Sequence, residues 1–251
     1  MLPPVKKEHG QHFLVDRNIL DVIGRLAELA PDDVVLEIGP GEGMLTRYLA
    51  DRVALVHGVE IDRSLEPHLR DIDNVTIHFG DALQMELPAE ATKLVANLPY
   101  NVATPIVVES LDGLPNIRLW CVMVQREVAD RFFADPGTKP FGAVSVLVQL
   151  VCERTGFHPV SRTAFRPRPN VDSALVAFRR VTMPVDYARV KEVVTAAFAH
   201  RRKTLPNSLE LAGLAARAVA AGALEAIGRD PSTRGEALAP QEFVALAREL
   251  P

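Results

Sequence analysis

The chain has 251 residues, a formal net charge of −4, and 48% apolar against 24% charged residues. This length suits one α/β catalytic domain with a smaller appendage, and the composition excludes a chain too polar to form a core. No stretch reaches the roughly 18 apolar residues needed to cross a bilayer, and the basic start of the sequence lacks the apolar centre of a signal peptide. We therefore expect a cytoplasmic protein that does not associate with membranes, and we expect it to be a monomer.

Helix-like and strand-like segments alternate in the first half of the chain. Apolar residues at helical spacing predict helices over 18–30 and 43–50. Short apolar runs predict strands, which lie at 34–39, 55–62, 75–81, 93–100 and 119–125. Because these strands are apolar almost throughout rather than alternating with polar residues, they indicate a parallel sheet covered on both faces, and hence an α/β fold.

The pattern changes after Pro136. Apolar runs predict two more strands, at 141–153 and 173–181. The segment between them, FRPRPNVDS (165–173), contains too much proline for a regular helix and predicts an ordered loop.

The spacing from Tyr187 onward is helical, with breaks at Pro206 and at 228–231. A helical segment of this size after a sheet-forming segment indicates a separate small domain. We therefore predict an α/β catalytic domain over 1–184 and a small helical domain over 185–251.

The sequence does not favour a metal site or a disulfide. Cys121 and Cys152 each lie in an apolar run, which predicts buried reduced thiols in a reducing compartment. The seven histidines show neither the HExxH pattern nor paired Cys/His spacing, so we expect no metal.

A basic segment is hidden within the negative net charge. Residues 154–203 contain eleven basic and three acidic residues, a charge of +8, which leaves −12 for the rest of the chain. Such a segment predicts local binding of nucleic-acid phosphates by a protein whose remainder repels them. A solvated basic surface without a ligand is the alternative interpretation.

A glycine-rich turn follows the first predicted strand, in LEIGPGEGMLT (36–46). Gly39, Gly41 and Gly43 remove side chains where the backbone must turn sharply and approach a ligand closely. Met44 stands where a dinucleotide-binding fingerprint has its third glycine, so the turn departs from that pattern.

Acidic residues surround this turn. Glu60 ends the next strand, 19 residues after Gly41, where a carboxylate can accept both ribose hydroxyls of a nucleoside cofactor. Asp81, followed by Ala82, ends the third strand and suits an adenine edge, while Glu37 suits a position near a positive charge. Three acids favour a cationic ligand over a pyrophosphate. The alternative is that Glu37 and Asp81 only cap helices or face solvent.

The tetrapeptide NLPY (97–100) ends the fourth predicted strand and indicates methylation of an adenine amine. The side-chain oxygen of Asn97 and the carbonyl of Leu98 can accept the two protons of N6, because Pro99 keeps that carbonyl out of regular pairing. Tyr100 can stack on the base. The alternative is an ordinary turn with a packed tyrosine.

Phe165, in the proline-rich loop, is a further candidate. On a loop stiffened by prolines and flanked by arginines, its ring could clamp a flipped base from the face opposite Tyr100. A buried core phenylalanine is the competing interpretation.

These motifs resemble those of the small-subunit ribosomal RNA adenine N6,N6-dimethyltransferase family over nearly the whole chain. The matching segments are GQHFL (10–14), LEIGPGEGMLT (36–46), VEID (59–62), NLPYNVATPI (97–106), FGAVSVLVQ (141–149), FRPRPNVDSALV (165–176), FAHRRKTLPNSL (198–209) and RGEALAPQEF (234–243).

The resemblance implies a Rossmann-like class I methyltransferase domain with a small C-terminal helical domain, and S-adenosylmethionine as the cofactor. It implies dimethylation of two adjacent adenosines near the 3′ end of small-subunit rRNA, in the pre-small ribosomal subunit. The basic segment, and not the resemblance, predicts RNA contacts at Arg201, Arg202 and Lys203. The implied cofactor contacts are His12, Leu14, Gly39, Glu60, Asp81 and Asn97.

Four alternatives remain open. A methyltransferase of the macrolide-resistance type would modify one adenine of large-subunit rRNA, whereas NLPYN and RRKTL favour the small subunit. A DNA adenine methyltransferase usually carries two prolines where this chain has Leu98 and Pro99. A non-catalytic RNA-binding assembly factor on the same fold would not need Asn97, Tyr100 and Glu60. A nicotinamide-dependent dehydrogenase would need the missing third glycine.

Overall fold

The computed structural model describes residues 12–251, which form two compact units. The first unit holds the described residues up to Ala129 together with Glu153–Arg180, and the second holds Asp130–Cys152 and Val181–Pro251. The boundary predicted after residue 184 falls inside the second unit. Because 130–152 belongs to that unit as well, a single cut in the sequence does not separate the two.

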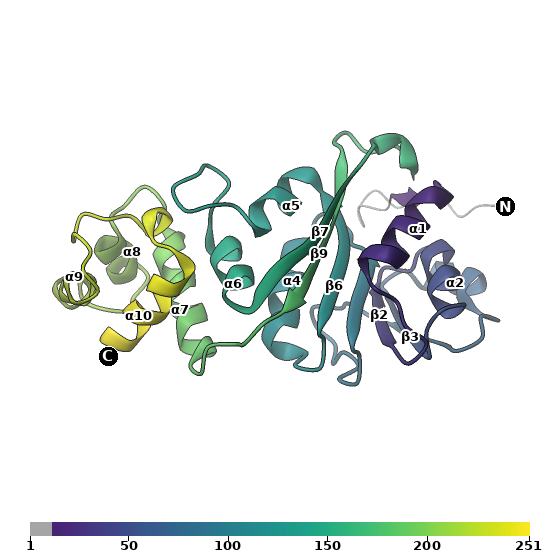
Figure 1. Cartoon of the computed structure of the whole chain (residues 1–251), viewed down its shortest axis with the longest axis horizontal. Coiled ribbons are helices and arrows are strands. Elements are labelled where there is room, and N and C mark those ends of the chain that lie inside the picture. Colours follow the sequence, from purple (N-terminus) through teal and green to yellow (C-terminus); the bar gives the residue numbers. More distant parts are fainter. Residues whose placement is uncertain (1–11) are drawn as a thin grey trace. The chain divides into compact units, whose positions relative to one another are not determined.

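The first unit is built around a seven-stranded sheet in the order β4-β3-β2-β5-β6-β9-β7 (Figure 1). The first five of these strands run parallel, whereas β9 runs antiparallel to β6. The parallel sheet predicted from the apolar runs is therefore confirmed. Its strands are β2 (Val34–Ile38), β3 (Leu55–Glu60), β4 (Val75–Phe79), β5 (Lys93–Asn97), β6 (Leu119–Gln125), β7 (Cys152–Val160) and β9 (Ser173–Arg180).

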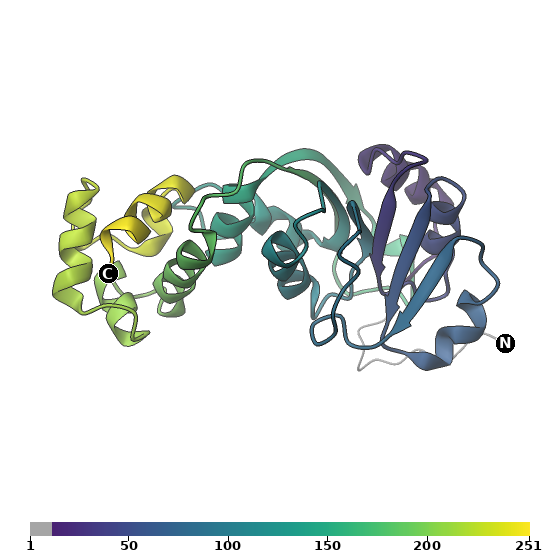
Figure 2. The same ribbon diagram turned by 90° about the horizontal axis from the view of Figure 1, so that it is seen from below.

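Helices cover both faces of the middle of this sheet, which is why β2, β5 and β6 are apolar almost throughout. Leu119, Cys121 and Met123 of β6 belong to the core on the side of α1 (Arg17–Leu26) and α2 (Met44–Ala50). Trp120 points to the other side, where its Nε1 donates to Ser110 Oγ of α4 (Ala103–Gly113) at 2.8 Å. Figures 1 and 2 show this layering from two directions.

Short elements complete the first unit. A two-residue strand near the start of the described chain, β1, pairs antiparallel with β8 of the proline-rich segment. The helix α5 begins directly after β6 and crosses into the second unit. The bounds of these elements are β1 (Phe13–Leu14), β8 (Phe165–Arg166), α3 (Glu66–Leu69), α5 (Arg126–Phe132), η2 (Arg63–Leu65) and η3 (Arg162–Ala164).

The strand predicted at 141–153 is wrong, because most of this segment forms a helix, α6 (Ala143–Val151). Seven of its nine residues are buried, so the run is apolar on nearly every side and carries no period that separates helix from strand. Its start is set by Ser145, whose hydroxyl accepts a hydrogen bond from the Gly142 N–H at 3.0 Å. The strand β7 follows only from Cys152.

The second unit is helical, as predicted from Tyr187 onward. Pro206 and Pro240 lie in the first turns of their helices, where a missing N–H costs nothing. An aromatic cluster lies in its core, with ring centroids of Phe141 and Phe243 at 6.0 and 5.9 Å from that of Phe198. Besides α6, its elements are α7 (Tyr187–Ala199), α8 (Leu205–Leu211), α9 (Arg217–Ala226), η4 (Gly235–Ala237) and α10 (Pro240–Glu249).

Both cysteines are buried thiols, as predicted. Burial raises the pKa of the Cys121 thiol to about 12, so it carries no reactive thiolate at neutral pH. None of the helices found in residues 12–251 combines the length and the apolar character needed to cross a membrane.

Candidate functional site

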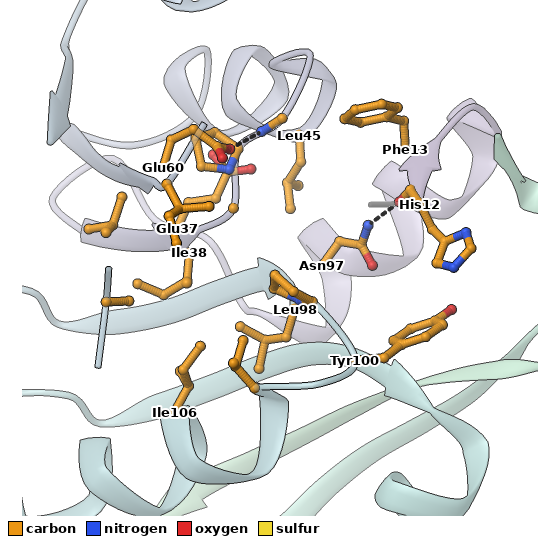
Figure 3. A pocket seen from close by; sticks show the side chains of 18 of the residues that line it. His12, Phe13, Glu37, Ile38, Leu45, Glu60, Asn97, Leu98, Tyr100 and Ile106 are labelled. Carbon is orange, nitrogen blue, oxygen red and sulfur yellow. Dashed lines mark hydrogen bonds between the residues drawn. The ribbon is translucent and has the colours of Figure 1, made fainter. Parts of the chain in front are cut away.

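A pocket of about 280 Å³ opens in the first unit at the carboxyl ends of the parallel strands, the edge at which such sheets bind ligands (Figure 3). Glu37 and Glu60 lie at one end of it, and His12 and Tyr100 lie at the other. The pocket brings together nearly all of the predicted cofactor and catalytic residues. Those that line it are His12, Leu14, Gly39, Gly41, Glu60, Asp81, Ala82, Asn97, Leu98, Pro99 and Tyr100.

The glycine turn between β2 and α2 forms one wall. Gly39, Gly41 and Gly43 have φ angles of +75°, +60° and +78°, a conformation that side chains disfavour. At Gly41 a Cβ would also lie 3.0 Å from the ring of Phe13. The turn therefore requires glycine for its backbone shape, and at Gly41 for the close approach of the N-terminal segment.

Glu60 ends β3 beside this turn. One of its carboxylate oxygens accepts the N–H of Gly41 at 3.0 Å, and the other accepts the N–H of Asp62 at 2.9 Å. Burial raises the pKa of Glu60, although these two hydrogen bonds oppose the rise. Each oxygen keeps a second lone pair, so the group can still accept hydrogen bonds from a ligand in the pocket.

Glu37, in β2, is the most perturbed acid of the site. Its side chain is 1% exposed, and its Oε2 has no hydrogen-bond partner among the described residues. Burial, with a smaller contribution from the charge of Glu60, raises the pKa of Glu37 to about 8. A buried carboxyl with one oxygen that lacks a partner is the kind of group that a cationic ligand would stabilise in its charged form.

Asp81 follows β4 at the pocket wall. Its Oδ1 accepts the N–H of Leu83 at 3.0 Å, and its Oδ2 accepts a proton of the Gln84 amide at 2.9 Å. The carboxylate thus stabilises the turn after β4, and it lines the pocket together with Ala82. Asp81 therefore stabilises a turn while lining the pocket, and its contact with a ligand stays a prediction.

Asn97 ends β5 at the centre of the pocket. Its Nδ2 donates to the carbonyl of His12 at 2.9 Å, which turns the amide oxygen away from that carbonyl (Figure 3). Leu98 is buried, and its N–H donates to the carbonyl of Met123 in β6 at 3.0 Å. The chain then turns, with the Val102 N–H donating to the carbonyl of Pro99 at 3.1 Å. The NLPY segment therefore leaves the sheet directly after Leu98, whose N–H is still bonded to β6.

Tyr100 lies within this turn. Its ring faces that of His12, with the centroids 5.3 Å apart and the planes 31° from parallel. Its hydroxyl lies 2.5 Å from Ser173 Oγ, at the start of β9. Burial raises the pKa of the Tyr100 phenol, so this group stays protonated at neutral pH.

Phe165 is the one predicted catalytic residue that the structure does not bring to the pocket. It is 4% exposed and belongs to the main core of the first unit, beside residues of α1 and β6. The pairing of β8 with β1 sets it opposite Leu14 and turns its ring into that core. A ring so buried has no free face to offer a base, and the competing interpretation as a core residue describes its position.

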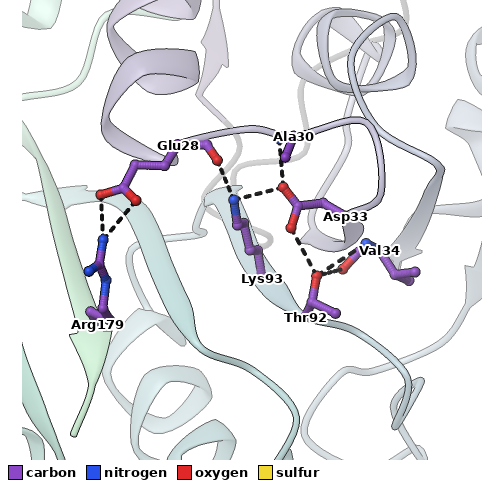
Figure 4. A network of polar contacts seen from close by, with 7 residues as sticks. All are labelled: Glu28, Ala30, Asp33, Val34, Thr92, Lys93 and Arg179. Atoms are coloured by element: carbon purple, nitrogen blue, oxygen red, sulfur yellow. Dashed lines mark hydrogen bonds and ion pairs between the residues drawn. The ribbon is translucent and has the colours of Figure 1, made fainter.

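The opposite ends of the same strands are held by a polar network (Figure 4). Lys93 Nζ, at the start of β5, lies 2.7 Å from Asp33 Oδ2 and donates to the carbonyl of Glu28. Asp33 also accepts the N–H of Ala30 at 2.7 Å, and the Glu28 carboxylate accepts two hydrogen bonds from Arg179 of β9. These contacts tie the segment after α1 to β5 and β9, whose other ends carry Asn97 and Ser173.

The predicted RNA-binding residues lie in the second unit, in the turn between α7 and α8. Arg201, Arg202 and Lys203 are exposed. Arg201 donates to the carbonyl of Phe141 at 2.8 Å and lies 3.4 Å from the Glu236 carboxylate. The structure thus presents three adjacent exposed cations. Of these, Arg201 is also bonded to other residues of the second unit.

Two pocket features escape sequence reasoning. The ring of Phe13 closes over Gly41, and the hydroxyl of Ser173 anchors Tyr100; both side chains come from segments distant in sequence from their partners. Phenylalanine and serine are not residue types that indicate a ligand site by themselves, so the sequence does not single out Phe13 or Ser173. Among residues 12–251, no group of three or more His, Cys, Asp or Glu side chains is arranged to hold a metal ion.

Known proteins resemble this chain in sequence over nearly its whole length. The family described as Ribosomal RNA adenine dimethylase matches residues 4–227. "Ribosomal RNA small subunit methyltransferase A" of Rubrobacter xylanophilus is 46% identical, over 99% of this chain and 96% of that protein. The protein of the same name from Syntrophotalea carbinolica is 44% identical, over 97% and 96%.

Solved structures resemble it in fold. A dimethyladenosine transferase from Plasmodium falciparum matches with a TM-score of 0.78 at 24% identity. The match covers 94% of this chain and 96% of the transferase. The 23S rRNA methyltransferase ErmE matches with a TM-score of 0.68 at 32% identity, over 95% of this chain and 99% of ErmE. These likenesses and the strand order confirm the Rossmann-like fold of class I methyltransferases.

Proposed function

The chain belongs to the ribosomal RNA adenine dimethylase family, and we propose from this that it methylates N6 of adenosine in small-subunit ribosomal RNA. It is an rRNA methyltransferase, and its substrate is two adjacent adenosines near the 3′ end of that RNA. The product is N6,N6-dimethyladenosine, formed on the pre-small ribosomal subunit. The observation that carries the proposal is Asn97, which a hydrogen bond to the His12 carbonyl orients at the centre of the pocket.

The cofactor that we propose is S-adenosylmethionine, which supplies an electrophilic methyl group on a positively charged sulfur. The groups in the pocket fit it. Glu60 offers two carboxylate oxygens to ribose hydroxyls, and Asp81 and Ala82, which line the pocket wall, suit the edge of an adenine. Glu37, whose raised pKa keeps it protonated at neutral pH in the ligand-free protein, would ionise beside a cation and then offer it a negative charge. The glycine turn lets the backbone come close to the bound molecule.

The chain must also make the amine of adenine reactive. The lone pair of N6 is delocalised into the ring, so acceptors for its two protons favour the pyramidal, nucleophilic form. We assign these acceptors to the Asn97 amide oxygen and the Leu98 carbonyl, while Tyr100 stacks on the base. Because the amine becomes acidic as it bonds to the methyl carbon, solvent can take the proton and no general base is required.

One experiment tests the whole proposal. Labelled S-adenosylmethionine is supplied with unmethylated small ribosomal subunits, large-subunit RNA or duplex DNA in parallel, and the modified nucleoside is then identified after digestion. We expect N6,N6-dimethyladenosine from the small-subunit reaction. Label in large-subunit RNA or DNA alone would refute the substrate, and absence of label from every reaction would indicate a non-catalytic RNA-binding protein.

One observation favours a second candidate function. The 23S rRNA methyltransferase ErmE, whose name specifies large-subunit RNA, is 32% identical to this chain. The curated relatives named for the small subunit are 46% and 44% identical, which favours the first candidate. The large-subunit reaction in the same experiment decides between them.

A further inference from the structure

Two hydroxyl groups from distant parts of the chain meet at the reaction end of the pocket. The Tyr100 hydroxyl and Ser173 Oγ lie within hydrogen-bond distance, 2.5 Å apart. Tyr100 follows β5 and Ser173 begins β9, and β6 lies between these strands in the sheet. The bond therefore reaches across the carboxyl end of β6.

The serine is the fixed partner of this pair. It is 1% exposed and stands opposite Gln125 in the β6–β9 ladder. The preceding residue, Asp172, accepts the N–H of Arg126 with its carbonyl at 3.0 Å and the N–H of Arg162 with its carboxylate at 3.1 Å. Tyr100, in contrast, lies in an irregular turn. The sheet therefore fixes the position of Ser173, and the hydrogen bond between the two hydroxyls then fixes the position of the Tyr100 ring.

A second contact restrains the same ring. His12 faces Tyr100 at a centroid distance of 5.3 Å, and its Nδ1 lies 2.8 Å from the carbonyl of Pro167. Both restraints on Tyr100 therefore lead to the proline-rich segment 165–173. This segment, from which the sequence predicts a stacking ring in Phe165, instead supports the ring of another residue.

We propose that Ser173 is a positioning residue whose hydroxyl holds the Tyr100 ring at the angle needed to stack on the target adenine. The inference rests on the proposed function, because it needs a base in the pocket. Its physical reason is pre-organisation: a ring already fixed in place loses little conformational freedom when the base binds. Ser173 has no direct part in methyl transfer and acts only through Tyr100.

The test is a double-mutant cycle of Ser173→Ala and Tyr100→Phe, with the single and double variants assayed on the RNA that the wild-type protein methylates. Tyr100→Phe keeps the ring and the packing, so it stays informative if Ser173→Ala lowers stability. The matched control is Ser110→Ala, because Ser110 is also buried and bonds an aromatic side chain, the Trp120 indole, away from the pocket.

We expect either single variant to lower kcat/KM roughly 3- to 10-fold, the range of one ordinary hydrogen bond. The double variant should be no worse than the poorer single variant, because both changes remove the same bond. Calorimetric affinity for S-adenosylmethionine should stay within about 2-fold of the wild-type value, since Ser173 is not among the residues that line the cofactor pocket.

A spectroscopic measurement separates positioning from a merely structural bond. RNA with fluorescent 2-aminopurine at the target position binds without being methylated, because this base lacks the N6 amine, and stacking on Tyr100 quenches its emission. We expect weaker quenching with Ser173→Ala and wild-type quenching with Ser110→Ala. Unchanged quenching, multiplicative losses in the double variant, or an equal loss in Ser110→Ala would overturn the inference.

The two proposals fail in different ways. An active wild-type protein with an unaffected Ser173→Ala variant would refute the positioning role and leave the proposed function intact. A wild-type protein that methylates none of the nucleic acids offered would refute both.

Discussion

The buried carboxyl of Glu37 predicts an unusual dependence of stability on pH. The group is 1% exposed in β2, and burial raises its pKa from 4.5 to about 8. At neutral pH the folded protein therefore keeps a proton that the unfolded chain has released. Replacing this residue by glutamine preserves its size and polarity and removes the titration.

The sign and size follow from proton linkage. Between pH 4.5 and about 8 the folded state binds one proton more than the unfolded state, so the free energy of unfolding falls as the pH rises. Each pH unit in this window is worth about 1.4 kcal/mol for one proton. Ionisation of Glu37 thus costs the protein on the order of 5 kcal/mol of stability across the window, and the loss is complete above the folded pKa.

The assay is urea denaturation of the ligand-free protein at intervals from pH 5.5 to 8.5. Other groups titrate in this range, so the informative quantity is the difference between wild type and variant. Between pH 5.5 and 8, the free energy of unfolding of Glu37→Gln should rise by roughly 3 kcal/mol relative to that of the wild type. Glu86→Gln, which makes the same change at an exposed position, should follow the wild-type curve. Parallel curves for wild type and Glu37→Gln would refute the reasoning.

Three further predictions concern other parts of the molecule. Asn97→Ala should abolish methyl transfer, while calorimetry still detects cofactor binding; unchanged turnover would remove Asn97 from the chemistry. Lys93→Met should lower the free energy of unfolding by about 3–5 kcal/mol in urea denaturation, because it leaves Asp33 buried without its cation, and a decrease below about 1 kcal/mol would contradict this. Arg202→Ala combined with Lys203→Ala should reduce the slope of log affinity for RNA against log salt by roughly 0.7–0.9 for each phosphate that these cations neutralise, and an unaltered slope would mean that they do not touch RNA.

The central sheet could be predicted because burial on both faces leaves a plain mark in the sequence. In β6, Leu119, Cys121 and Met123 contact the α1 side and Trp120 contacts α4, so nearly every position is apolar and the run is unmistakable. The same rule fails at α6, which is buried on nearly every side within the second unit. A fully buried helix and a fully buried strand are both continuous apolar runs, and only tertiary packing separates them.

Some features of the site follow from local sequence and could be predicted, whereas others depend on contacts between distant segments and could not. The glycine turn and Glu60 could be predicted, because backbone conformation and strand ends are local properties that spacing reports. Tyr100 could be named, but its anchor could not, since Ser173 lies 73 residues further along the chain and meets it only through the strand order. The family resemblance alone points to His12; its role, a carbonyl that orients Asn97, depends on a contact 85 residues apart in sequence.

Counting charges in the sequence also overstates how many cations are available to RNA. Within the basic segment 154–203, Arg179 bonds the Glu28 carboxylate, Arg180 donates to three backbone carbonyls, and Arg189 pairs with Glu192. A cation already paired gains less from a phosphate, because the existing partner must first be given up. Within the described part of the chain, neither Arg202 nor Lys203 forms an ion pair. Arg168, also in this segment, is exposed and forms no ion pair with a described residue either. The salt dependence of RNA binding should therefore follow such unpaired cations rather than the net charge of +8.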